Sequence, residues 1–242
     1  ASGTTDWGTP SKGVSKVHIK SRSGAQSNAV IDGLRGKTVV RTDSTVAEFD
    51  GTTAYLTAFN TDGFTVGTST SVNNGETYIA YQTLYTHIKW GTTNQSKFYI
   101  EAYNPLTGEG MVYYIGSGTT GHEIPHSQGV ELGYFEIKDL SDTSAWNIFY
   151  GEDNVRLAFD TSAKTDSLTS WDSPSSQTNI TLGSGGAVNQ IDVENIMYYK
   201  ANSQTTAIGT YTGTGAAGNF VPTYDSEGNP RKPRRVTTKR ID

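Results

Sequence analysis

The residues best suited to chemistry lie in the string Gly121-His122-Glu123-Ile124-Pro125-His126, which places two imidazoles four residues apart with a carboxylate between them. On a helix this spacing brings both rings to one face, as in the zinc-binding motif HExxH. Here Pro125 and the neighbouring glycines prevent a helix, because proline removes a backbone donor and glycine is a poor helix former. We therefore expect a turn that enters a strand, without a metal site or other cofactor.

A second motif, Gly116-x-Gly118-x-x-Gly121, has the glycine spacing of a dinucleotide-binding loop. Such a loop holds pyrophosphate at the N-terminus of the helix that follows it. No helical pattern follows Gly121, so the glycines indicate turns. The chain also has no cysteine, and it has no Ser-His-Asp set in a recognisable local context. We therefore expect a protein that is not an enzyme.

Aromatic residues between positions 84 and 106 are better binding candidates. Trp90, Tyr85 and Tyr99 lie in two β-type runs joined by a polar turn, and His87 and Tyr103 belong to the same runs. A later part of the chain repeats the earlier part but lacks this segment, so the fold does not require it. Rings on such added loops often contact a partner. The alternative is that these rings cover the core.

A further binding candidate is Trp171, which lies in a polar stretch with Asp160, Asp166 and Asp172. An aromatic platform beside carboxylates suits a sugar, and clustered carboxylates suit calcium. The alternative is a solvated loop around one core tryptophan, because exposed acids are the ordinary state of a soluble surface.

The composition is that of a globular chain rich in turns. Of 242 residues, 27 are glycine and 18% are charged, while 14 Tyr, 8 Phe and 4 Trp supply core material that a disordered chain lacks. The absence of cysteine excludes disulfides and thiolate metal sites. No apolar run approaches the ~20 residues that cross a bilayer, so we expect no membrane insertion.

Charge is distributed unevenly along the chain. Residues 231–242 hold six of the 19 basic residues and one of the 24 acids, which leaves 13 basic and 23 acidic residues, a net charge of −10, in the remainder. An acidic body and a basic tail favour contact between subunits, and the body would repel the phosphates of a nucleic acid. The basic residues expected to act in assembly are Arg231, Lys232, Arg234, Arg235, Lys239 and Arg240.

Short apolar runs bounded by Gly, Asp, Asn and Ser recur about every ten residues, and no helical period persists for three turns. This pattern predicts an all-β fold of antiparallel, jelly-roll-like sandwiches. The runs also repeat at an offset of 116, as in Phe64-Thr65-Val66-Gly67 and Ile180-Thr181-Leu182-Gly183, or Val72-Asn73 and Val188-Asn189. Repeats of this kind indicate a duplicated unit.

The repeat predicts two tandem β-sandwich domains. The first spans residues 1–112 and carries an inserted hairpin at about 84–106, and the second spans 113–210. Residues 211–242 are expected to begin a truncated third copy that continues into the basic C-terminal extension.

The string Gly121–Val130, the strand Phe135–Asp139 and the closing segment Val72–Tyr81 together resemble a tandem β-domain of unknown function found in tail-fibre and other virion proteins of tailed phages. The family's Leu-Gly step is Gln128-Gly129 here. The resemblance covers most of the chain but consists of structural glycines and apolar positions, so it implies a setting and no site residues.

That resemblance implies a structural virion protein, either a tail-fibre, baseplate or capsid-surface component. Its expected partners are other copies of itself, neighbouring virion proteins and a glycan of the host surface. A carbohydrate-binding module, built on residues such as Trp90 and Trp171, is the alternative from another class.

Overall fold

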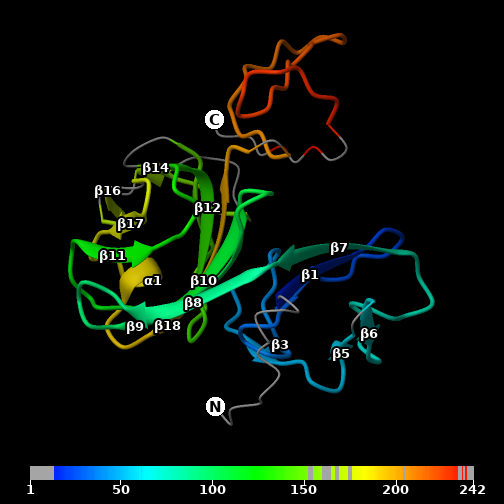
Figure 1. Cartoon of the computed structure of the whole chain (residues 1–242). Helices are drawn as coiled ribbons and strands as arrows, with labels where there is room; N and C mark the ends of the chain where they lie inside the picture. Colours follow the sequence, from blue (N-terminus) through cyan, green and yellow to red (C-terminus); the bar gives the residue numbers. More distant parts are fainter. Residues whose placement is uncertain are drawn as a thin grey trace.

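The computed structural model describes residues 14–60, 62–151, 155–159, 165–166, 169–173, 176–203, 205–233, 236 and 238 (Figure 1). Within these ranges every strand pairing is antiparallel. The one helix that they contain is the short α1 (Gly186–Asn189). The predicted all-β, antiparallel fold class is confirmed.

The sequence repeat is also a repeat of strand pairing. In the first part of the chain, β1 (Val14–Ser21) lies between β2 (Ala29–Asp32) and β7 (Tyr78–Tyr85). In the second part, β12 (Leu132–Asp139) lies between β13 (Asn147–Phe149) and β18 (Glu194–Ala201) in the same way. In each copy, a long early strand, β1 or β12, therefore pairs with a later long strand, β7 or β18.

The small ribbons repeat as well. Strand β3 (Thr38–Val39) pairs with β4 (Phe49–Asp50), as β14 (Val155–Arg156) pairs with β15 (Thr165–Asp166). Strand β5 (Leu56–Phe59) pairs with β6 (Phe64–Val66), as β16 (Trp171–Ser173) pairs with β17 (Asn179–Leu182). Both of the latter pairs contain a shift in register. The two copies thus share their connectivity down to an irregularity in one hairpin.

The inserted hairpin lies in a different sheet from the one that the sequence suggests. Strands β8 (His87–Thr92), β9 (Phe98–Asn104) and β10 (Glu109–Ile115) extend the sheet of the second copy, in the order β13-β12-β18-β10-β9-β8. The predicted boundary between residues 112 and 113 falls inside β10. Seven residue pairs join β10 to β18, so the added strands cover the open edge of the second sheet.

The six-stranded sheet is the central layer, because apolar side chains are buried on both of its faces. On one face Phe135 and Tyr199 pack with Ile124 of β11 (His122–Pro125), Trp171 and Val188. The opposite face packs on the sheet β2-β1-β7, in a cluster whose members include Val14, Tyr85, Met111, Trp146 and Tyr198. A third cluster lies between that sheet and the β5–β6 ribbon. The two copies therefore share a buried interface.

Beyond β18 the chain leaves the sheets. The Ser203 and Thr206 hydroxyls both donate to the Thr107 carbonyl, each at 2.9 Å, which holds the start of the extension against the β9–β10 turn. The segment that follows, coloured orange to red, stands apart from the sheets (Figure 1). In the described part of residues 211–242, the one β pairing is an isolated bridge between Tyr224 and Pro230.

Candidate functional site

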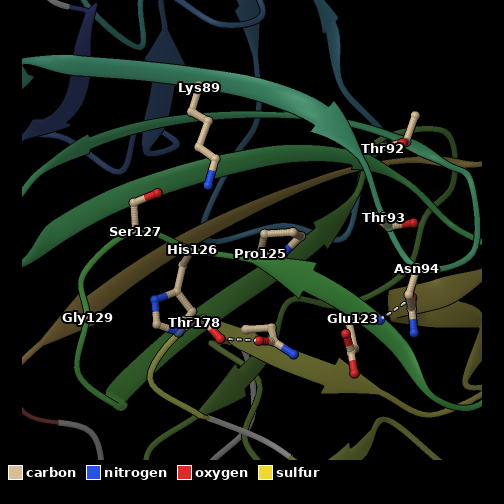
Figure 2. Close-up of a pocket in the computed structure, with 11 residues that line it drawn as sticks. Lys89, Thr92, Thr93, Asn94, Glu123, Pro125, His126, Ser127, Gly129 and Thr178 are labelled. Atoms are coloured by element: carbon tan, nitrogen blue, oxygen red, sulfur yellow. Dashed lines mark hydrogen bonds between the residues drawn. The ribbon is translucent and has the colours of Figure 1, made fainter.

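A groove of about 400 Å³, lined mainly by residues with polar side chains, lies where the inserted hairpin meets β11 (Figure 2). Its walls are the β8–β9 turn, the segment that follows β11 and the residues just before β17. The polar side chains that line it include those of Lys89, Asn94, Glu123, His126, Ser127 and Thr178. Lys89 points from β8 into the groove, above Ser127 and His126.

Asn94 connects the hairpin to the opposite wall of the groove. Its Oδ1 accepts a hydrogen bond from the backbone amide of Glu123 at 2.9 Å, and its Nδ2 donates to the Gly121 carbonyl at 2.8 Å. Both bonds cross from the β8–β9 turn to the β11 segment. They fix the width of the groove at this end, because one side chain satisfies backbone groups on the far wall.

A buried carboxylate holds Ser127 in place. Glu101 is fully buried, and it accepts hydrogen bonds from the Ser127 amide at 2.8 Å, the Ser127 hydroxyl at 2.7 Å and the Tyr199 hydroxyl. Burial raises the pKa of Glu101, while these donors and the charge of Lys89, its partner in the β8–β9 register, act in the opposite direction. Ser127 therefore occupies a defined position in the lining.

The two histidines of the sequence motif have separate environments. His122 is buried; its Nδ1 donates to the Asn189 Oδ1 at 2.9 Å, and its Nε2 accepts from the Thr93 hydroxyl at 2.9 Å. His126 donates from Nε2 to the Ser176 carbonyl at 3.1 Å, and burial lowers its pKa to about 4. Its ring is therefore neutral near pH 7, and within the described residues its Nδ1 has no hydrogen-bond partner.

The spacing of these histidines does not suit one metal ion. Both rings face inward from an extended strand with Ile124 between them, and four residues of strand span ~13 Å. Throughout the described ranges no three His, Asp or Glu side chains gather in a way that could hold a metal. The motif instead supplies structural hydrogen bonds.

The structure separates the four residues expected to bind a ligand. Trp90 is 67% exposed, whereas Tyr85, Tyr99 and Trp171 are at most 5% exposed. Trp171 donates from Nε1 to the Val155 carbonyl at 3.0 Å, and its ring meets Phe135 edge-on. These three side chains form core contacts, which is the alternative that the sequence left open, and only Trp90 offers a ring to a ligand.

Trp90 and Lys89 point to opposite faces of β8, as adjacent strand residues do. The groove therefore lies on the face away from Trp90. On the groove face, His87 stacks on Tyr103 with ring centroids 5.0 Å apart. This cross-strand pair lies two residues along the strands from the Lys89–Glu101 pair, so both pairs share one face. Of the acids near Trp171, Asp172 is exposed, Asp160 lies outside the described residues, and the side chain of Asp166 is not among those described.

Sequence reasoning missed Lys89, Asn94, Glu101 and Ser127. The string around His122 pointed to this region, but its predicted chemistry was that of a metal. The available signal was the alternation along β8, in which His87 and Lys89 share one face while Ile88 and Trp90 share the other. The partner strand and its buried Glu101 are not visible from that pattern.

The C-terminal extension is the second candidate region. Arg231 forms an ion pair with Asp225 at 2.6 Å and remains 55% exposed, and Lys232 is exposed. Arg234, Arg235, Lys239 and Arg240 lie outside the described residues. Large apolar side chains in the extension are also exposed: Tyr211 53%, Phe220 84%, Val221 39%, Tyr224 50% and Val236 69%.

In the described part of the chain, no helix has the length and apolar character needed to cross a membrane.

Comparison with known proteins identifies the family of the chain. Neither the curated proteins nor the solved structures contain a match to this chain. A family model described as a domain of unknown function, DUF7483, matches residues 11–242 and so spans both copies and the extension. The chain therefore belongs to the DUF7483 family.

Proposed function

We propose that this chain is a structural assembly protein of a tailed phage, as a tail-fibre, baseplate or capsid-surface component. Its partners in this proposal are other copies of itself and neighbouring proteins of the virion. The resemblance of its repeat to virion domains supports the setting. The state of the C-terminal extension supports the assembly role.

The observation that carries the proposal is the exposure of large apolar side chains in the extension. Phe220 is 84% exposed and Val236 is 69% exposed, and both lie in the extension that follows the last strand, β18. A partner that buries one such side chain gains about 1.5–3 kcal/mol. An extension with five of these side chains therefore favours a bound state.

The distribution of charge supports contact between the extension and another copy of the chain. Residues 1–230 carry a net charge of −10, and residues 231–242 carry six basic residues and one acid. A basic, partly apolar segment is attracted to the acidic body of a neighbouring copy. This complementarity favours contact between copies over contact with nucleic acid.

The test compares the full chain with a chain that ends at Thr210, using size-exclusion chromatography with light scattering. The shorter chain keeps the Ser203 and Thr206 hydrogen bonds to Thr107, so its sheets stay intact. We expect the full chain to exceed the monomer mass and the shorter chain to run as a monomer. Equal masses for the two chains, whether monomeric or assembled, would contradict the proposal.

The alternative function, a carbohydrate-binding module, is favoured by one observation on Trp90. Its indole is 67% exposed on the added strand β8, and exposed aromatic rings stack on sugars. Under this alternative, Trp90→Ala abolishes glycan binding. A host-surface glycan is also compatible with the assembly proposal, because a virion protein can attach and assemble through different surfaces.

A further inference from the structure

We propose that the groove between the β8–β9 turn, β11 and residues 178–179 is a binding site for a neutral, hydroxyl-rich ligand, a saccharide. This site lies on the opposite face of β8 from Trp90. The proposal does not depend on assembly through the extension.

The lining of the groove selects hydroxyl groups because it presents donors and acceptors together. Lys89 offers an ammonium that has no ion pair among the residues described, Glu123 offers an exposed carboxylate, and Thr178 offers a hydroxyl. A sugar hydroxyl both donates and accepts, so it satisfies each of these groups. A negatively charged ligand would be repelled by Glu123, and a positively charged ligand would be repelled by Lys89.

The size and shape also suit a small ligand. The volume of about 400 Å³ lies within the range of small-molecule sites, roughly 300–1,000 Å³. The groove is open to solvent, so a longer chain of sugars can continue out of it. The stacked His87–Tyr103 pair lies on the same face of the ribbon, beside Lys89, and gives a continuing sugar an aromatic surface.

Hydrogen bonds within the protein hold the walls of the groove before any ligand arrives. Asn94 fixes the β11 wall through Gly121 and Glu123, and the fully buried Glu101 fixes Ser127. Thr178 is held by its hydrogen bond to Asn179 at 2.6 Å. Lining groups that are already ordered lose less conformational entropy when a ligand binds, which raises the affinity of the groove for a saccharide.

The experiment screens the full chain on an array of neutral and acidic glycans and measures the affinity of a hit by calorimetry. Lys89→Ala removes the central donor of the groove, and Trp90→Ala removes the neighbouring side chain on the opposite face. We expect Lys89→Ala to weaken binding by about tenfold or more, as for the loss of a charged hydrogen bond. We expect Trp90→Ala to change the affinity by less than about twofold.

Three outcomes would overturn the assignment. The first is an array without any binding, and the second is binding confined to acidic glycans. The third is binding that Trp90→Ala abolishes and Lys89→Ala leaves unchanged, which would move the site to the other face. Both positions are exposed, so thermal unfolding should show that both variants fold. Light scattering of the same variants should give the mass of the parent chain, which separates this test from the test of assembly.

Discussion

At the scale of single residues, Asn73 and Asn189 show how closely the two copies agree. Asn73 donates from Nδ2 to the Gly67 carbonyl at 2.9 Å, and Asn189 donates to the Gly183 carbonyl at 2.7 Å. Asn189 and Gly183 each lie 116 residues after their counterparts, Asn73 and Gly67. The backbone amides also match, since Asn73 bonds to Ser69 and Asn189 to Gly185. The duplicated Val-Asn step is therefore a duplicated turn.

The same steric restriction explains why both copies have a glycine at the start of this turn. A Cβ at Gly67 would lie 2.5 Å from the Ala54 carbonyl oxygen, and one at Gly183 would lie 2.2 Å from the Thr169 carbonyl oxygen. No side chain fits at such a distance, because a backbone carbonyl cannot move aside. The two glycines are thus required by the close approach of the turns that precede β5 and β16.

In the second copy, Asn189 makes further hydrogen bonds that its counterpart Asn73 lacks among the described residues. Asn189 is fully buried, and its Oδ1 accepts from the Ser117 amide at 2.8 Å and from His122 at 2.9 Å. We expect Asn189→Ala to lower the free energy of unfolding by roughly 3 kcal/mol, because it leaves buried partners without bonds. Urea unfolding followed by tryptophan fluorescence measures this change.

The equivalent change in the first copy is the matched control. Asn73 is exposed and has one side-chain hydrogen bond among the described residues, so Asn73→Ala should cost roughly 1 kcal/mol. Equal costs for the two variants would show that Asn189 does not have the added structural role that its buried contacts indicate.

The sequence predicted these turn positions well and the binding residues poorly. Val72-Asn73 and Val188-Asn189 could be matched because a turn depends on nearby residues. The roles of Tyr85, Tyr99 and Trp171 depend on which sheet covers them, and the same aromatic residue types serve cores and binding surfaces. Glu101 was missed because its three donors come from distant parts of the chain.

At the scale of elements, the strands were predictable but the partner of the inserted hairpin was not. Alternating apolar residues identify β8 and β9 as strands. They do not indicate that β10, which the repeat divides between the copies, pairs with β18 near the end of the chain. Long-range pairing of this kind depends on which edge is open after the rest of the sheet has formed.

A buried polar network joins the first sheet to the six-stranded sheet. Arg35 bonds to Asp32 at 2.7 Å and to Glu48 at 2.8 Å, and its side chain is 2% exposed. Tyr198 of β18 donates to the same Asp32 carboxylate at 2.6 Å. The network connects strands of both copies, so the two sheets should unfold together.

We expect Tyr198→Phe to lower the free energy of unfolding by about 1–2 kcal/mol, because a buried carboxylate loses a donor while the packing of the ring is kept. Tyr78→Phe is the control: its hydroxyl bonds to the Thr70 carbonyl in an exposed setting, and its loss should cost less than about 0.5 kcal/mol. Urea unfolding of both variants should give a single transition. Two separate transitions would contradict the shared interface.

At the scale of the whole molecule, basic residues and exposed apolar side chains are gathered in the C-terminal extension. The basic residues of the extension lie at the end of a segment with exposed Tyr211, Phe220 and Tyr224, while the rest of the chain is acidic. The sequence predicted this separation of charge directly. The exposure of the apolar residues needed the structure, because a sequence does not tell which rings have a partner.

The central claim, that residues 211–242 bind another copy, is tested most directly by cross-linking. A photoreactive phenylalanine analogue replaces Phe220, and chains labelled with light and heavy isotopes are mixed before illumination. Mass spectrometry then identifies the joined peptides. We predict cross-links between light and heavy chains, from position 220 to residues within 14–203. Cross-links confined to a single chain, at concentrations where light scattering shows assembly, would contradict the account.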